Sequence, residues 1–168
     1  YKRQVLNRYA TGFSIKWPND IYWHDKKIAG ILIENVLSGS TFSRAIIGMG
    51  LNINQKNFYS DAPNPVSLYQ ITGRTYKIEK ILDEFTEAFG KRYTDTFTNS
   101  SDRIHKEYIA ALYRNDGVYP FYSDGNIFHA SIADVELDGH LLLSTESGEK
   151  KRFAFKEVSF LSLIHISE

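Results

Sequence analysis

Five polar residues in the first third of the chain have side chains that could bind a small anion. Lys16, Asn19 and Asp20 stand in the string KWPND, Lys27 opens the apolar run KIAGILIE, and Asn52 follows GMGL. Lysine ammonium groups are good point-charge partners for phosphate and carboxylate. Asparagine carboxamides pair a donor with an acceptor and can read an adenine edge, and Asp20 could bind Mg²⁺ or cap a turn. Together these residue types suit a small anionic, nucleotide-like ligand.

Three glycines interrupt the apolar runs that follow. Gly30 lies in KIAGILIE, and Gly48 and Gly50 lie in IIGMGLNIN, two runs that we expect to be neighbouring strands. Glycine weakens the interior of a strand and generally marks a bulge or the close approach of a ligand. GMGLN lacks the third glycine and the helix of a dinucleotide fingerprint. We therefore favour a flat ligand that lies across the sheet, with Lys27 able to reach whatever lies over Gly30.

Each of these residues also has a purely structural explanation. A lysine beside a turn is generally solvated surface, asparagine is a common turn residue, and a glycine can simply mark a bulge. Residue types and spacing therefore lead only to a sheet with glycine gaps, whose lysines and asparagines could hold an anionic ligand. They do not name that ligand.

The candidate site residues lie in or beside segments that we expect to form a small sheet. Strand-like patterns cover residues 13–18, 21–23, 28–33 and 42–54. Because these segments are close in sequence, an antiparallel meander is the economical topology. The tail of a helix is expected over residues 1–12, with Gly12 as its C-terminal stop. Apolar residues at helical spacing then predict helices over residues 78–93 and 103–113.

Beyond residue 115 the period of the apolar pattern changes to two. Short strand-like runs are separated by Asp124-Gly125, Asp138-Gly139 and Ser147-Gly148, and this rhythm of turns is typical of a small barrel or sandwich. We therefore predict two domains, 1–115 and 116–168. The predicted fold class is α+β: a mixed or antiparallel sheet with helices packed on one face, followed by a small β domain.

Composition excludes several classes of protein. The 168 residues include 20 Lys and Arg against 20 Asp and Glu, and a balanced charge is not the footprint of a nucleic-acid-binding chain. Cysteine is absent, which removes disulfides and thiolate sites, and the five histidines show no metal-ligand spacing. The apolar runs are too short to span a bilayer. A cytoplasmic protein without membrane or nucleic-acid partners is the expectation.

Three blocks, KWPNDI at 16–21, KIAGILIE at 27–34 and IIGMGLNIN at 46–54, together resemble the biotin protein ligase family, the biotin–[acetyl-CoA-carboxylase] ligases. The resemblance covers roughly residues 10–115, which look like the later part of the family's class II synthetase-like catalytic domain. It extends more loosely over the small β domain, which is similar to the family's C-terminal SH3-like barrel.

The resemblance implies a ligase that uses biotin, ATP and Mg²⁺ in two steps. Biotin is activated to biotinyl-5′-AMP and then transferred to a lysine of a biotin carboxyl carrier protein. Lys27 matches the family's catalytic lysine, which contacts both biotin and the phosphate. The other implied contacts to biotin are Gly30, Gly48 and Gly50. The other implied contacts to ATP and the adenylate are Lys16, Asn19, Asp20 and Asn52, with Asp20 beside the metal.

The chain also departs from the family. It contains no Gly-Arg-Gly-Arg string of the loop that covers the adenylate, and no DNA-binding segment precedes the sheet. We expect a fragment truncated at its N-terminus, with weak biotin binding, no accumulation of adenylate and a sheet face able to form a homodimer. SLIHISE at the C-terminus is expected to be a foreign tail. Two alternatives stay open: a lipoate ligase-like acyl-adenylate enzyme, and a non-catalytic module for carrier docking or dimerisation.

Overall fold

The computed structural model describes residues 2–39, 41–59, 63–98 and 101–161. It divides into two compact units, Tyr1–Ile104 and His105–Glu168. The predicted domain boundary, between residues 115 and 116, lies later in the chain than this division. In the second unit the His105 Nε2 atom lies 2.7 Å from an oxygen of Asp134, so the helix that carries His105 is tied to the sheet that follows. The predicted SLIHISE tail lies outside the described residues.

The first unit is built on a four-stranded antiparallel sheet, ordered β1-β2-β3-β4. The strands are β1 (Phe13–Lys16), β2 (Asp20–Trp23), β3 (Lys26–Ser38) and β4 (Thr41–Leu51). The predicted meander is confirmed. The first strand, however, ends at Lys16 and not at Pro18, because residues 17–19 form the turn to β2 and proline cannot donate to a strand ladder. The strand β3 is longer than the predicted 28–33.

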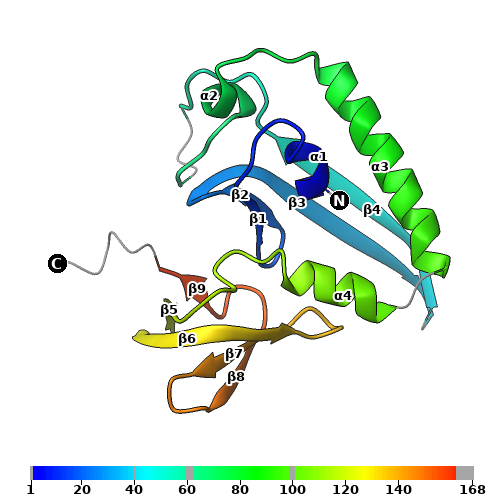
Figure 1. Cartoon of the computed structure of the whole chain (residues 1–168). Helices are drawn as coiled ribbons and strands as arrows, with labels where there is room; N and C mark the ends of the chain where they lie inside the picture. The colour runs from blue at the N-terminus through cyan, green and yellow to red at the C-terminus, as the bar shows by residue number, and fades with distance from the viewer. Residues whose placement is uncertain (1, 40, 60–62, 99–100, 162–168) are drawn as a thin grey trace. The chain divides into compact units, whose positions relative to one another are not determined.

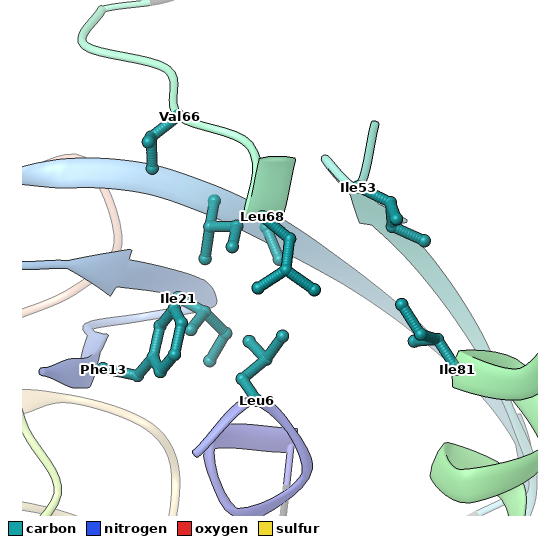
Figure 2. Close-up of a cluster of buried hydrophobic side chains, with 9 residues drawn as sticks. Leu6, Phe13, Ile21, Ile53, Val66, Leu68 and Ile81 are labelled. Carbon is teal, nitrogen blue, oxygen red and sulfur yellow. The ribbon is translucent and has the colours of Figure 1, made fainter. Parts of the chain in front are cut away.

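Helices lie against one face of this sheet. They are α1 (Lys2–Leu6), α2 (Leu68–Thr72) and α3 (Ile78–Thr98), and Figure 1 shows α1 and α3 beside the long β3–β4 ribbon. Figure 2 shows their side chains converging with those of the strands on one buried cluster. Its members are Leu6, Phe13, Ile21, Ile28, Ala29, Ile53, Val66, Leu68 and Ile81. The α+β class with helices on one face of an antiparallel sheet is therefore confirmed for this unit.

Two local predictions need correction. The helix α1 ends at Leu6, and Gly12 is not its stop. Gly12 instead has φ 93° at the entry to β1, where its carbonyl oxygen accepts a hydrogen bond from the backbone N–H of His24. The short helix α2 was not predicted, although its signal is in the sequence: Ser67 and Gln70 form a capping box, the pattern of a serine followed three residues later by glutamine.

Tyr9 connects the segment after α1 to α3. Its hydroxyl donates a hydrogen bond to Glu84 Oε2 at 3.0 Å, and its ring meets Tyr76 edge to face with the centroids 5.0 Å apart. Burial, and then the hydrogen bond to Glu84, raises the pKa of Tyr9 to about 12. The protonated phenol is therefore favoured in the folded state.

This shift predicts a loss of stability at high pH. Because the folded pKa lies above the unfolded value of about 10, the contribution of Tyr9 is complete below pH ~10 and is lost as the pH rises towards about 12. We expect Tyr9→Phe to be less stable by about 1 kcal/mol at pH 8 and to lose less stability than the wild type above pH ~10. Urea unfolding at pH 8 and at high pH checks this. Parallel losses in both proteins would contradict it.

The second unit is a five-stranded antiparallel sheet, ordered β8-β7-β6-β5-β9. Its strands are β5 (Tyr119–Ser123), β6 (Asn126–Val135), β7 (Leu141–Thr145), β8 (Lys150–Phe153) and β9 (Ser159–Phe160), and they follow α4 (Ser101–Ile109). Phe121, Phe128, Phe153 and Phe160 form a chain of ring contacts in it. The predicted small β unit is confirmed. Its closure into an SH3-like barrel stays a prediction, because no pairing between β8 and β9 appears among the residues described.

Across the described parts of both units, no helix is long and apolar enough to cross a membrane.

Candidate functional site

One row of residues crosses the four-stranded sheet and, with Gly48 beside it, contains five of the predicted site residues. Lys16 of β1 is the register partner of Asp20 on β2, Asp20 is the partner of Gly30 on β3, and Gly30 is the partner of Gly50 on β4. Register partners present their side chains to the same face of a sheet. Gly48 lies two residues from Gly50, so it is on this face too. We call these five residues the glycine row.

Lys27 reaches the middle of the glycine row. Its Nζ atom lies 2.7 Å from Asp20 Oδ1, and the two side chains are 37% and 23% exposed. A Cβ atom built at Gly30 would lie 3.4 Å from Asp20 Oδ1 and from Lys27 Cε and Nζ, whereas one at Gly50 would meet nothing within 4 Å. The ion pair therefore lies over Gly30, beside open space at Gly50. Partial exposure limits its worth to about 0–1 kcal/mol and leaves it accessible to a ligand.

Lys16 is held by a residue that was not predicted. Its ammonium donates a hydrogen bond to the Tyr22 hydroxyl at 3.0 Å and lies 4.5 Å from the centroid of that ring. Tyr22 is buried, with 7% of its surface exposed. The sequence could have indicated this residue, because Tyr22 lies two residues after Asp20 and residues at this spacing in a strand share one face.

The two asparagines use their amides to hold backbone in this structure. Asn19 Nδ2 donates to the carbonyl oxygen of Ile31 at 2.6 Å, and Asn52 Nδ2 donates to that of Val66 at 3.2 Å. These bonds match the structural explanation of each asparagine, as a turn or strand-end residue. Their role in reading adenine stays a prediction.

A segment after the sheet borders Lys27 and was also missed. The backbone N–H of Lys27 donates to the carbonyl oxygen of Asn64 at 2.8 Å, and the N–H of Val66 donates to the carbonyl oxygen of Lys27 at 2.9 Å. Leu68 N–H donates to Asn52 O at 3.0 Å, so the same segment is anchored beside Asn52. The sequence between residues 55 and 64 reads as loop, which gives no signal for such pairing.

A cavity of about 210 Å³ lies on the other face of the sheet. Ala29, Met49 and Leu51 contribute to it from β3 and β4, and they alternate in sequence with Gly30, Gly48 and Gly50. The rest of the lining comes from α1, α3, Ile21 of β2 and Ile53, and it is wholly apolar. Such a lining offers no partner to an anion, so the candidate site is the glycine row and not this cavity.

The predicted metal role of Asp20 concerns a carboxylate that is already engaged. The Asp20 carboxylate holds the Lys27 ammonium, and it does not belong to any group of three His, Asp or Glu side chains within the part of the chain that is described. Glu136, Asp138 and His140 do form such a group, but Arg152 bonds to all three. The metal role of Asp20 therefore stays a prediction.

Comparisons with known proteins identify the family. Residues 5–52 match the Biotin/lipoate A/B protein ligase family. The bifunctional ligase/repressor BirA of Bacillus spizizenii is 30% identical over 148 residues, which are 83% of this chain and 44% of that protein. The biotin–[acetyl-CoA-carboxylase] ligase of Paracoccus denitrificans is 30% identical over 109 residues, which are 62% of this chain and 45% of that protein.

A solved structure agrees in fold. The biotin protein ligase of Aquifex aeolicus, in complex with biotin and ATP, superposes with a TM-score of 0.72 at 22% identity, covering 95% of this chain and 67% of that one. The fold, together with the sequence of residues 5–52, thus defines the class of biotin/lipoate ligases. Within that class, the chain belongs to the biotin protein ligase family. It spans less than half the length of the two curated relatives.

Proposed function

We propose that the glycine row and Lys27 form part of the site at which biotin is activated by ATP. The observation that carries this proposal is the Lys27–Asp20 ion pair lying over Gly30, with no side chain over Gly50. A partly exposed ammonium provides an anion site, and the bare backbone beside it accepts a flat group. Leu32, the register partner of Gly48, is 61% exposed and extends the surface with an apolar side chain. This surface suits an acyl substrate with a carboxylate at one end.

The proposed reaction has two steps. A carboxylate oxygen of biotin attacks the α-phosphorus of ATP, the bond to the β-phosphate oxygen breaks, and pyrophosphate leaves. The amine of a lysine on a biotin carboxyl carrier protein then attacks the acyl carbon of biotinyl-5′-AMP, AMP leaves, and the amine loses a proton.

Lys27 contributes to the first step by electrostatics. The biotin carboxylate and the triphosphate of ATP are both anions that must approach one another. Negative charge then grows on the oxygens around the α-phosphorus. A fixed ammonium stabilises that charge more than water does when the site excludes solvent. Asp20 holds the ammonium over Gly30 until the anions arrive. Lys16, in the same row, offers a second cation for the phosphates.

The names of the relatives support the choice of substrates. The Paracoccus protein is named for biotin and acetyl-CoA carboxylase, and the Aquifex structure contains biotin and ATP. Mg²⁺ would enter with the triphosphate, since magnesium is commonly bound through substrate phosphates. We further propose that the second unit is the SH3-like domain of the family, because it contains a small five-stranded antiparallel sheet that follows the first unit in the chain.

Biotin-dependent release of pyrophosphate from MgATP by the native protein tests the proposal. Calorimetric titration of biotin and then of lipoate separates the two acyl substrates: tighter binding of lipoate would favour the lipoate ligase alternative. Binding of a carrier domain with no pyrophosphate release would favour the non-catalytic docking module. Release that depends on biotin is the expected result.

A further inference from the structure

The strand β2 contacts both lysines of the candidate site, and it does so diagonally. Asp20 is the register partner of Lys16 but forms its ion pair with Lys27. Tyr22 is the register partner of Lys27 but accepts its hydrogen bond from Lys16. Each lysine therefore contacts, on the adjacent strand β2, a residue other than its own register partner.

Tyr22 holds Lys16 by two kinds of contact. The hydroxyl oxygen accepts a hydrogen bond from the ammonium at 3.0 Å, and the ring lies 4.5 Å from the same nitrogen. A cation over an aromatic face is attracted by the ring quadrupole. A long lysine side chain otherwise samples many rotamers, and fixing them before a ligand binds lowers the entropy lost on binding.

Tyr22 is too deeply buried to contact a ligand directly. Tyr22 is 7% exposed, so its phenol offers almost no surface to a substrate. Lys16, in contrast, is only partly buried and lies in the row that ends at the open space over Gly50. An effect of Tyr22 on a ligand is therefore indirect, and the two contacts with Lys16 give it a route.

We propose that Tyr22 is a positioning residue that fixes the Lys16 ammonium for the phosphates of the nucleotide substrate. This inference rests on the proposed function in that it takes the nucleotide to be ATP. Asp20 and Lys27 then serve the reacting carboxylate and α-phosphate, while Tyr22 and Lys16 set the affinity for the polyphosphate. The two pairs act on different parts of the substrates.

A double-mutant cycle in the native protein tests the inference. Tyr22→Phe removes the hydrogen bond and keeps the ring, and we expect it to weaken MgATP binding by about three- to tenfold. Biotin affinity should stay within about twofold. In a Lys16→Gln background, Tyr22→Phe should change MgATP affinity by less than about twofold, because residues that act as one unit are not additive.

Tyr9→Phe is the matched control. It also removes one phenol hydrogen bond, but to Glu84, outside the glycine row, and it should leave MgATP affinity unchanged. Three results would overturn the inference: an effect of Tyr22→Phe that persists in the Lys16→Gln background, an equal loss of biotin affinity, or no effect in the wild-type background.

A second measurement keeps the inference testable if the protein binds no nucleotide, a result that would remove the proposed function. The ring of Tyr22 should shift the Lys16 Cε proton resonances upfield in the NMR spectrum of the chain, and Tyr22→Phe should reduce that shift, because the ammonium loses its hydrogen bond to the hydroxyl. Tyr22→Leu should abolish it. Unshifted Lys16 resonances in the wild type would show that Tyr22 does not position this side chain.

Discussion

Lys27→Ala should lower the rate of biotin-dependent ATP–pyrophosphate exchange by about 10²–10³, the usual loss when one charge-stabilising contact at a reacting phosphate is removed. The fold should survive, because the Lys27 side chain is partly exposed and its ion pair with Asp20 contributes little to stability. The measurement is exchange of labelled pyrophosphate into ATP by the native protein, with the melting temperature recorded beside it.

Lys26→Ala is the matched control for Lys27→Ala. Lys26 precedes Lys27 on β3, is exposed and is the register partner of Trp23, so its loss removes the same charge from the same strand. We expect exchange by this variant to stay near the wild-type rate. Exchange by Lys27→Ala at the wild-type rate, or an equal loss in both variants, would overturn the role proposed for Lys27.

Gly30→Val should weaken biotin binding by roughly 5- to 150-fold while the melting temperature stays near that of the wild type. The first side-chain carbon would touch Asp20 and Lys27 at 3.4 Å, an ordinary contact. The two further methyl groups of valine would enter the space that we assign to the ligand, and a clash of the size of core overpacking, about 1–3 kcal/mol in the bound state, corresponds to roughly 5- to 150-fold in affinity. Valine is itself a good strand former. Calorimetry with biotin and thermal unfolding measure the two effects.

Two other glycines serve as controls. Gly50→Val fills the open part of the row, where a Cβ atom meets nothing within 4 Å, so it should weaken biotin binding without moving Lys27. Gly90→Ala, on α3, should leave binding unchanged and stabilise the chain by about 0.5–1 kcal/mol. Undiminished biotin affinity in Gly30→Val would show that Gly30 serves only the strand, as a residue near the bulge. The register shift that marks this bulge lies between Ile21 and Tyr22.

Some of the predicted site residues lie at the proposed anion site, whereas others are hydrogen-bonded to the backbone. Lys16, Asp20, Lys27 and Gly30 meet on one face, as the position of Lys27 before a glycine-containing run had suggested. Asn19 and Asn52 are occupied with backbone carbonyl oxygens. Sequence reasoning could not separate these cases, because asparagine has the same propensity for a turn whether or not it also binds a ligand.

The sequence by itself determined the antiparallel meander, the long helix and the β character of the last third. These follow from the period of apolar residues and from turn residues, which act between neighbours in the chain. It also indicated that Gly30 and Gly50 belong to adjoining strands. The resemblance carried by KWPNDI, KIAGILIE and IIGMGLNIN identified the family, which the curated relatives then confirmed.

Only the tertiary structure decided which side chains meet. The row from Lys16 to Gly50 depends on the register of three strand pairs, and a slip of one residue would turn every side chain to the other face. The hold of Tyr22 on Lys16 and the pairing of Lys27 with residues 64–66 likewise depend on how side chains and a loop pack around the sheet. Local propensity carries no information on register or packing, because both are set by contacts between residues that the chain brings together only when it folds.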